Sequence, residues 1–222
     1  EISERITGKK IHTSGIVPGG MTFHLSSENR KALLEWIPEA LETVKLGIGI
    51  IKNFQEENVD MVKSFAISPS HYLGTVGKDG EHEVYDGKLR FVDMDGNIMQ
   101  DQLDPARYLD FIAERSVNWS YLTYPYYKPL GYENGIYRVG PLARLNIASR
   151  MKTPFAQTEL EKFKKINAGK PVHGTFYFHY ARMIEALSAV EEIQLLLLDN
   201  RIISTNIRTR GHWNQSEGIG SS

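Results

Sequence analysis

The side chains in this sequence best suited to chemistry are its histidines, because cysteine does not occur. Without cysteine the chain offers no thiolate for zinc, nickel or an iron-sulfur cluster, and no cysteine nucleophile. The histidines follow no His-x-x-x-His or His-Glu-x-x-His spacing, so the sequence predicts no zinc site and no catalytic residue. The histidines are His12, His24, His71, His82, His173, His179 and His212.

A second candidate is a line of polar residues in an otherwise apolar segment. His179, Arg182 and Glu185 are spaced three apart and would share one face of a helix. Such a line can relay protons, but buried polar groups are more commonly satisfied networks that hold neighbouring helices in register. We favour the structural role.

Two glycine runs and one aromatic run are candidates for nucleotide binding. The run at 47–51 lies inside a helical pattern and the run at 217–222 follows no expected strand, so neither predicts a dinucleotide loop. The dense aromatic residues of 119–137 are typical of a base-stacking platform or of a packed loop. A formal net charge of -1 provides no field for nucleic acid, which favours the packed loop.

The elements that position these residues are expected to be mainly helical. Apolar residues recur at steps of three and four over 28–57, after Ser26 or Ser27 as a cap, and Pro38 predicts a kink or a junction of two helices. Capping and stop signals predict further helices over 104–116, 153–169 and 175–200.

The apolar residues of 72–104 do not follow the helical spacing, and this segment predicts a small antiparallel β meander. Three Asp-Gly pairs separate short β-prone runs, and Asp-Gly favours tight hairpin turns. Asp93, Asp95 and Asn97 invite a calcium interpretation, but the glycine and glutamate positions of a calcium loop are absent. We therefore expect turn chemistry here.

Length and composition indicate a folded globular protein. The 222 residues suffice for one large domain or two small ones, and length alone does not choose between them. No apolar run approaches the roughly 20 residues of a membrane span, and the first ten residues lack the pattern of a secretory signal. We expect a protein that binds no nucleic acid and has no membrane span.

Several stretches, in order, resemble the middle of the large subunit of nickel-iron hydrogenases, in the cytoplasmic branch linked to nicotinamides. They are GKKIHTSGIVPGGM, YLGTVGKDGEHEVYDGKLRFVD, WSYLTYPYYK, YRVGPLARLN, TPFAQTELEKF and HGTFYFHYARMIEAL. The resemblance implies a mainly α (α+β) fold, with a helical core at about 26–70 and 104–200 and a β meander at about 72–104. Residues 1–222 would be the middle portion of the subunit.

The resemblance also implies a reaction and partners for a longer parent protein. That parent would be an enzyme that oxidises H2 reversibly at a nickel-iron centre held by two Cys-x-x-Cys motifs. Its partners would be an iron-sulfur small subunit, together with a diaphorase or other electron-carrier module. Since neither motif occurs here, we expect the chain itself to bind no nickel and to be inactive.

Few functional positions carry over from the family. His12, followed by Pro18, Gly19 and Gly20, is similar to the histidine that faces the iron-sulfur cluster of the small subunit. The alternative interpretation is that His12 is an ordinary loop histidine. Glu217 begins the run that, in the family, leads to an arginine beside the iron.

Two rival interpretations stay open at this point. A nickel-free relative could serve as a quinone-binding or proton-coupling subunit of a respiratory complex, which would explain the missing cysteines. A non-enzymatic helical module could use the aromatic run 119–137 to dock a partner.

Overall fold

The computed structural model describes residues 2–210, 216, 218 and 219, and the chain divides into two compact units. Unit 1 comprises residues 1–46 and 189–218, and unit 2 comprises residues 47–188 and 219–222. The expectations for His212, Glu217 and most of the glycine run 217–222 lie outside the described residues. Two long helices, α2 (Ser27–Glu57) and α8 (Tyr177–Leu198), contribute residues to both units.

Unit 1 is built around the first part of α2 and the last part of α8. Leu25, Leu33, Ile37 and Leu197 form its buried core. Arg30 donates hydrogen bonds to the carbonyl oxygens of Leu197 (2.5 Å) and Leu198 (3.0 Å), which have no partner within the helix because they end it. The smaller elements are α1 (Ile2–Thr7), β1 (Ile16–Val17), β2 (Gly20–Met21) and the 3₁₀ helix η3 (Asn200–Ile203).

The start of α2 follows the capping chemistry expected from the sequence. The hydroxyl oxygen of Ser26 accepts a hydrogen bond from the backbone N–H of Asn29 at 3.1 Å, which makes Ser26 the N-cap. The helix continues through the exposed Pro38, so this residue does not divide the segment into two helices.

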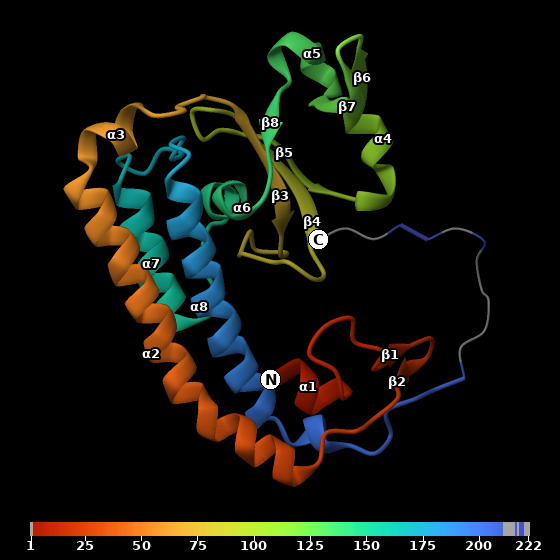
Figure 1. Ribbon diagram of the computed structural model, residues 1–222. Coiled ribbons are helices and arrows are strands. Elements are labelled where there is room, and N and C mark those ends of the chain that lie inside the picture. The colour runs from red at the N-terminus through yellow and green to blue at the C-terminus, as the bar shows by residue number, and fades with distance from the viewer. Residues whose placement is uncertain (1, 211–215, 217, 220–222) are drawn as a thin grey trace. The chain divides into compact units, whose positions relative to one another are not determined.

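Unit 2 contains a four-stranded sheet in the order β5-β4-β3-β8 (Figure 1). Strands β3, β4 and β5 pair antiparallel, which confirms the meander, and β8 joins β3 in parallel. The hairpin between β4 and β5 is closed by Asp93, whose carboxylate accepts from the backbone N–H groups of Asp95 and Asn97 at 2.9 and 2.8 Å. Turn chemistry is therefore confirmed. The strands are β3 (His71–Val76), β4 (Lys88–Val92), β5 (Ile98–Leu103) and β8 (Tyr137–Arg138).

Each face of this sheet buries its own apolar cluster, because alternate strand residues point to opposite sides. Tyr72 and Val76 pack with Ala143 and Ile147 of α6 (Pro141–Ile147) on one face. Leu73, Leu89, Phe91 and Tyr127 form the cluster on the other face. The sheet thereby fixes the position of α6, which carries part of the site described below.

The expected helix over 104–116 is wrong in its second half. A 3₁₀ helix, η1 (Pro105–Arg107), and α4 (Tyr108–Phe111) are followed by strand β6 (Ile112–Val117). Strand β6 pairs antiparallel with β7 (Ser120–Tyr127), which is built from the aromatic run. Cross-strand pairing with these aromatic side chains outweighs the helical propensity of Ala113 and Glu114.

The helices expected over 153–169 and 175–200 are confirmed as α7 (Pro154–Lys165) and α8 (Tyr177–Leu198). The second half of α2 runs beside α7 (Pro154–Lys165) and α8 (Figure 1). The shorter helical segments are α3 (Val59–Ser64), α5 (Gly131–Asn134) and the 3₁₀ helix η2 (Lys128–Leu130). The fold class is α+β. Within the described part of the chain, no helix combines the length and apolar character needed to traverse a bilayer.

Candidate functional site

The best-defined polar site in unit 2 is an ion network centred on Glu185 of α8. Arg144 of α6 donates two hydrogen bonds to the Glu185 carboxylate, from Nε to Oε1 at 2.6 Å and from a terminal guanidinium nitrogen to Oε2 at 2.8 Å. His82 adds a third contact, from Nε2 to Oε1 at 2.8 Å. A two-point contact of this kind fixes orientation as well as distance.

Three separate elements bring this network together. Helix α6 starts at Gly140, which has a positive φ of 84°, and Pro141, so Arg144 falls at the end of its first turn. The backbone N–H of His82 donates to the carbonyl oxygen of Arg150 at 2.8 Å, which holds the loop after β3 in place. Glu185 comes from the middle of α8. The network therefore joins a helix, a second helix and a loop.

The network keeps Glu185 charged. Burial of this carboxyl alone would raise its pKa, but hydrogen bonds from Arg144 and His82 together lower the pKa below its ordinary value. The same contact raises the pKa of Arg144. A carboxylate held ionised between two donors is a poor proton acceptor at neutral pH, which favours the structural role over a proton relay.

The polar line expected along α8 does not form one connected chain. His179 and Arg182 contact each other, with 3.4 Å between His179 Nδ1 and a guanidinium nitrogen, and both are more exposed than Glu185. The polar pattern in the sequence therefore indicates Glu185 but neither of the two residues that bind its carboxylate. Both partners lie in stretches that carry the family resemblance, Arg144 in YRVGPLARLN and His82 in YLGTVGKDGEHEVYDGKLRFVD, but no spacing pattern links either of them to Glu185.

A second buried polar group lies at the start of β3. The hydroxyl of Tyr72 is 2.6 Å from Nδ1 of His173 and 3.1 Å from the carbonyl oxygen of Val172. Burial raises the pKa of Tyr72 to about 12, and burial also lowers the pKa of His173. At neutral pH both groups are uncharged, so the pair forms a neutral hydrogen bond that ties the sheet to the segment before α8.

His12 lies in unit 1, on a loop held by backbone pairing. Its side chain is exposed and its backbone has a positive φ of 51°. The loop leads into the β1–β2 hairpin, where Pro18 and Gly19 form the turn. The backbone of residues 19–21 then pairs with residues 207–209, through Met21 N–H to Ile207 O at 2.9 Å and Thr209 N–H to Gly19 O at 2.8 Å.

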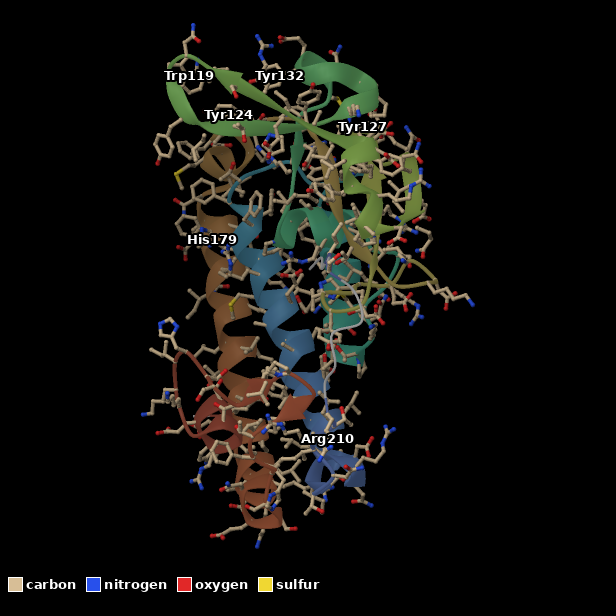
Figure 2. All side chains as sticks on the ribbon, turned by 90° about the vertical axis from the view of Figure 1, so that its right-hand side faces the viewer. Trp119, Tyr124, Tyr127, Tyr132, His179 and Arg210 are labelled. Atoms are coloured by element: carbon tan, nitrogen blue, oxygen red, sulfur yellow. The ribbon has the colours of Figure 1, made fainter. Side chains whose placement is uncertain are left out.

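The aromatic run forms an open hairpin and not a packed loop. Figure 2 shows Trp119 and Tyr124 on this hairpin, and their ring centroids are 5.4 Å apart. Trp119 is 76% exposed and Tyr121 is 97% exposed, whereas Tyr127 is buried against Phe91. The expectation of a packed loop therefore fails at the tip of the hairpin and holds at its base.

The residues present do not fit a metal centre or an iron-sulfur cluster. The sequence has no cysteine, and across the described ranges no three His, Asp or Glu side chains gather in a way that could hold a metal ion. Of the calcium candidates Asp93, Asp95 and Asn97, Asp93 accepts hydrogen bonds from within the turn through both carboxylate oxygens.

Comparison with known proteins connects the chain with hydrogenases. No protein-family model matches it. It is 37% identical over 220 residues to a subunit of the vhu F420-non-reducing hydrogenase of Methanocaldococcus jannaschii, covering 99% of this chain and 52% of that protein. It is 35% identical over 205 residues to the beta subunit of the NAD-reducing hydrogenase HoxS of Cupriavidus necator, covering 90% of this chain and 42% of that protein.

The chain is also similar to a third hydrogenase subunit and to a solved hydrogenase structure. An F420-non-reducing hydrogenase iron-sulfur subunit of Archaeoglobus profundus is 32% identical over 231 residues, covering 99% of this chain and 47% of that protein. The crystal structure of an NAD+-reducing [NiFe]-hydrogenase in the H2-reduced state superposes with a TM-score of 0.87 at 34% identity, covering 94% of this chain and 46% of that one. The chain thus spans about half the length of the proteins it matches.

These names correct the expected type of subunit. The relative from Archaeoglobus profundus is named an iron-sulfur subunit, and none of the three relatives is named a large or catalytic one. The likeness to hydrogenases stands, but the assignment to the nickel-binding large subunit, with its catalytic role and nickel-iron centre, is not retained. Residues 1–222 themselves supply none of the soft thiolates that nickel and low-spin iron prefer.

Proposed function

We propose that this chain is part of a hydrogenase subunit, an oxidoreductase component acting within a multisubunit complex. The observation that carries the proposal is the fold likeness, a TM-score of 0.87 at 34% identity over 94% of the chain. The relatives cover it almost completely and all those named above are hydrogenase subunits. Residues 1–222 would form the middle portion of such a subunit.

The proposed role of this portion is to hold the complex together beside its electron-transfer route. The buried polar groups of unit 2 support a structural role for this portion, because the side chains of the Glu185 network and of the Tyr72 pair hydrogen-bond to each other. The partners proposed are a subunit that bears iron-sulfur clusters and an electron-carrier module. A cytoplasmic location is part of the proposal, and cell fractionation tests it.

His12 is the residue we propose to face the cluster-bearing partner. Its imidazole is exposed, and its loop leads into a hairpin whose far strand is pinned to residues 207–209, so the side chain is presented from an anchored segment. An imidazole N–H near a cluster can tune its potential by hydrogen bonding.

The experiment measures binding of this chain to the cluster-bearing subunits of the same hydrogenase by size-exclusion chromatography and native mass spectrometry. His12→Asn is the informative variant, because asparagine tolerates the positive φ at this position. His24→Asn is the matched control, since His24 is another exposed loop histidine of unit 1.

The expected result is a stable complex, weakened about tenfold by His12→Asn and unchanged by His24→Asn. A shift in the midpoint potential of the nearest cluster in the His12→Asn complex would support the tuning role. Failure of the chain to join the complex would overturn the proposed function. Equal behaviour of the two variants would overturn the role of His12 alone.

A further inference from the structure

A cavity of about 450 Å³ lies within unit 2, among α2, α3, α7 and α8. Its aliphatic lining residues are Val59, Val62 and Ile166. The other lining residues are three lysines, one glutamine, one glutamate and two tyrosines. A concave site that combines an apolar wall with a few convergent polar groups is the usual form of a small-molecule site.

The charge around this cavity is predominantly positive. Glu159 is shared by two ammonium groups, with Lys52 Nζ at 2.5 Å from Oε2 and Lys162 Nζ at 2.6 Å from Oε1, and Tyr180 donates to the same carboxylate at 2.7 Å. A third ammonium, that of Lys63, lines the cavity and has no ion pair with any residue the structure describes. Glu56, a lining residue, is the second carboxylate beside Glu159, so the three ammonium groups remain in excess.

The cavity also has donors suited to a negatively charged group. The side-chain nitrogen of Gln55 is buried and finds no hydrogen-bond acceptor in the described part of the chain. A buried amide without a partner is costly, which marks the place where an acceptor from a ligand would sit. Burial raises the pKa of Tyr177, another lining residue, so its hydroxyl stays protonated and able to donate.

We propose that this cavity binds a small organic carboxylate with an apolar or aromatic body. The ligand carboxylate would accept from the Gln55 amide and pair with the Lys63 ammonium. Its body would lie against Val59, Val62 and Ile166. This site is independent of the proposed hydrogenase role, because neither His12 nor the Glu185 network contributes to it.

The test uses the 222-residue chain with benzoate as the probe and benzamide as its neutral counterpart of the same shape. Isothermal titration and saturation-transfer NMR report binding. A ligand of this size is expected to bind with a millimolar Kd, and benzoate is expected to bind about tenfold tighter than benzamide because it gains a charged contact.

Two variants locate the site and one serves as a control. Lys63→Gln is expected to weaken benzoate binding about tenfold and to leave benzamide binding unchanged. Lys78→Gln is the matched control, since Lys78 is an exposed lysine of unit 2 outside the cavity. Gln55→Met is expected to weaken benzoate binding while leaving the Tm equal or raised, because it removes a buried donor without a partner.

The Tm of Gln55→Met separates a ligand-binding glutamine from a structural one. A structural glutamine would lower the Tm when replaced, and that result overturns its assignment as a free donor. The proposal as a whole is overturned by absence of binding at about 20 mM benzoate, by equal affinity for benzoate and benzamide, or by equal losses in Lys63→Gln and Lys78→Gln.

Discussion

Replacing Glu185 with glutamine should destabilise unit 2 by about 3 kcal/mol at neutral pH, because breaking a buried ion pair leaves its partner charge uncompensated. Glutamine keeps the shape of the side chain but places an N–H₂ donor where Arg144 and His82 require an acceptor. The side chains of Glu185 and His82 are 14% and 6% exposed, so water compensates little. Arg144 is 21% exposed, which places the loss at the lower end of the range for buried pairs.

The loss should depend on pH in a defined direction. The pKa of Glu185 is lower in the folded chain than its ordinary value of 4.5, because the hydrogen bonds from Arg144 and His82 outweigh burial. Its contribution to the free energy of unfolding is therefore fully present above pH 4.5 and is lost as the pH falls toward the lower, folded-state pKa. Glutamine does not titrate, so the gap between wild type and variant should narrow in acid.

Urea unfolding followed by hydrogen exchange of the β3 amides measures this effect specifically in unit 2. The matched control is Glu133→Gln, which breaks an exposed pair with Arg115 whose N–O distance is 2.9 Å and should cost under about 0.5 kcal/mol. The reasoning is refuted if Glu185→Gln loses no more than Glu133→Gln, or if its deficit at pH 3.5 (about one unit below the ordinary pKa) equals its deficit at pH 7.

Three other substitutions have expected outcomes. Tyr72→Phe removes the hydroxyl 2.6 Å from His173 Nδ1 and should lower the free energy of unfolding by about 1 to 2 kcal/mol in urea titrations. Gly20→Ala would place a Cβ 2.0 Å from the carbonyl oxygen of Ile207, so hydrogen exchange should show lost protection in residues 207–209. Trp119→Ser should change thermal stability by under about 0.5 kcal/mol, since the side chain is 76% exposed, and a larger loss would show that it is packed.

Local signals in the sequence predicted the long helices α2, α7 and α8 and the meander. The apolar steps after the Ser26 cap define α2, and the Asp93 turn closes a hairpin through bonds made within five residues. Strand β6 was missed because its sequence, IAERSV, is unremarkable by itself and depends on the aromatic strand that follows. Tertiary pairing decides such a segment, and a single sequence does not display it.

The contacts of the candidate site also depend on tertiary structure that a single sequence does not display. Glu185 was recognisable as a polar residue within an apolar helix, but its partners come from positions 41 and 103 residues away. The favoured interpretation, a network that holds neighbouring helices in register, agrees with Glu185, whose carboxylate binds a different helix and a loop, but not with His179 and Arg182, which contact each other. The pocket beside Lys63 could not be predicted either, because its lining comes from four separate helices.

The pairing of residues 19–21 with residues 207–209 has a consequence for the order of folding. Unit 1 consists of two segments separated by residues 47–188, whereas nearly all of unit 2 is one continuous stretch. During synthesis, the ribosome completes that stretch before it releases residues 207–209, which pair with residues 19–21 of the β1–β2 hairpin. Closing so long a loop is entropically unfavourable, and prior compaction of the intervening stretch shortens the effective loop. The segment carrying His12 therefore acquires its final backbone partners late, after the ion network around Glu185 can already have formed.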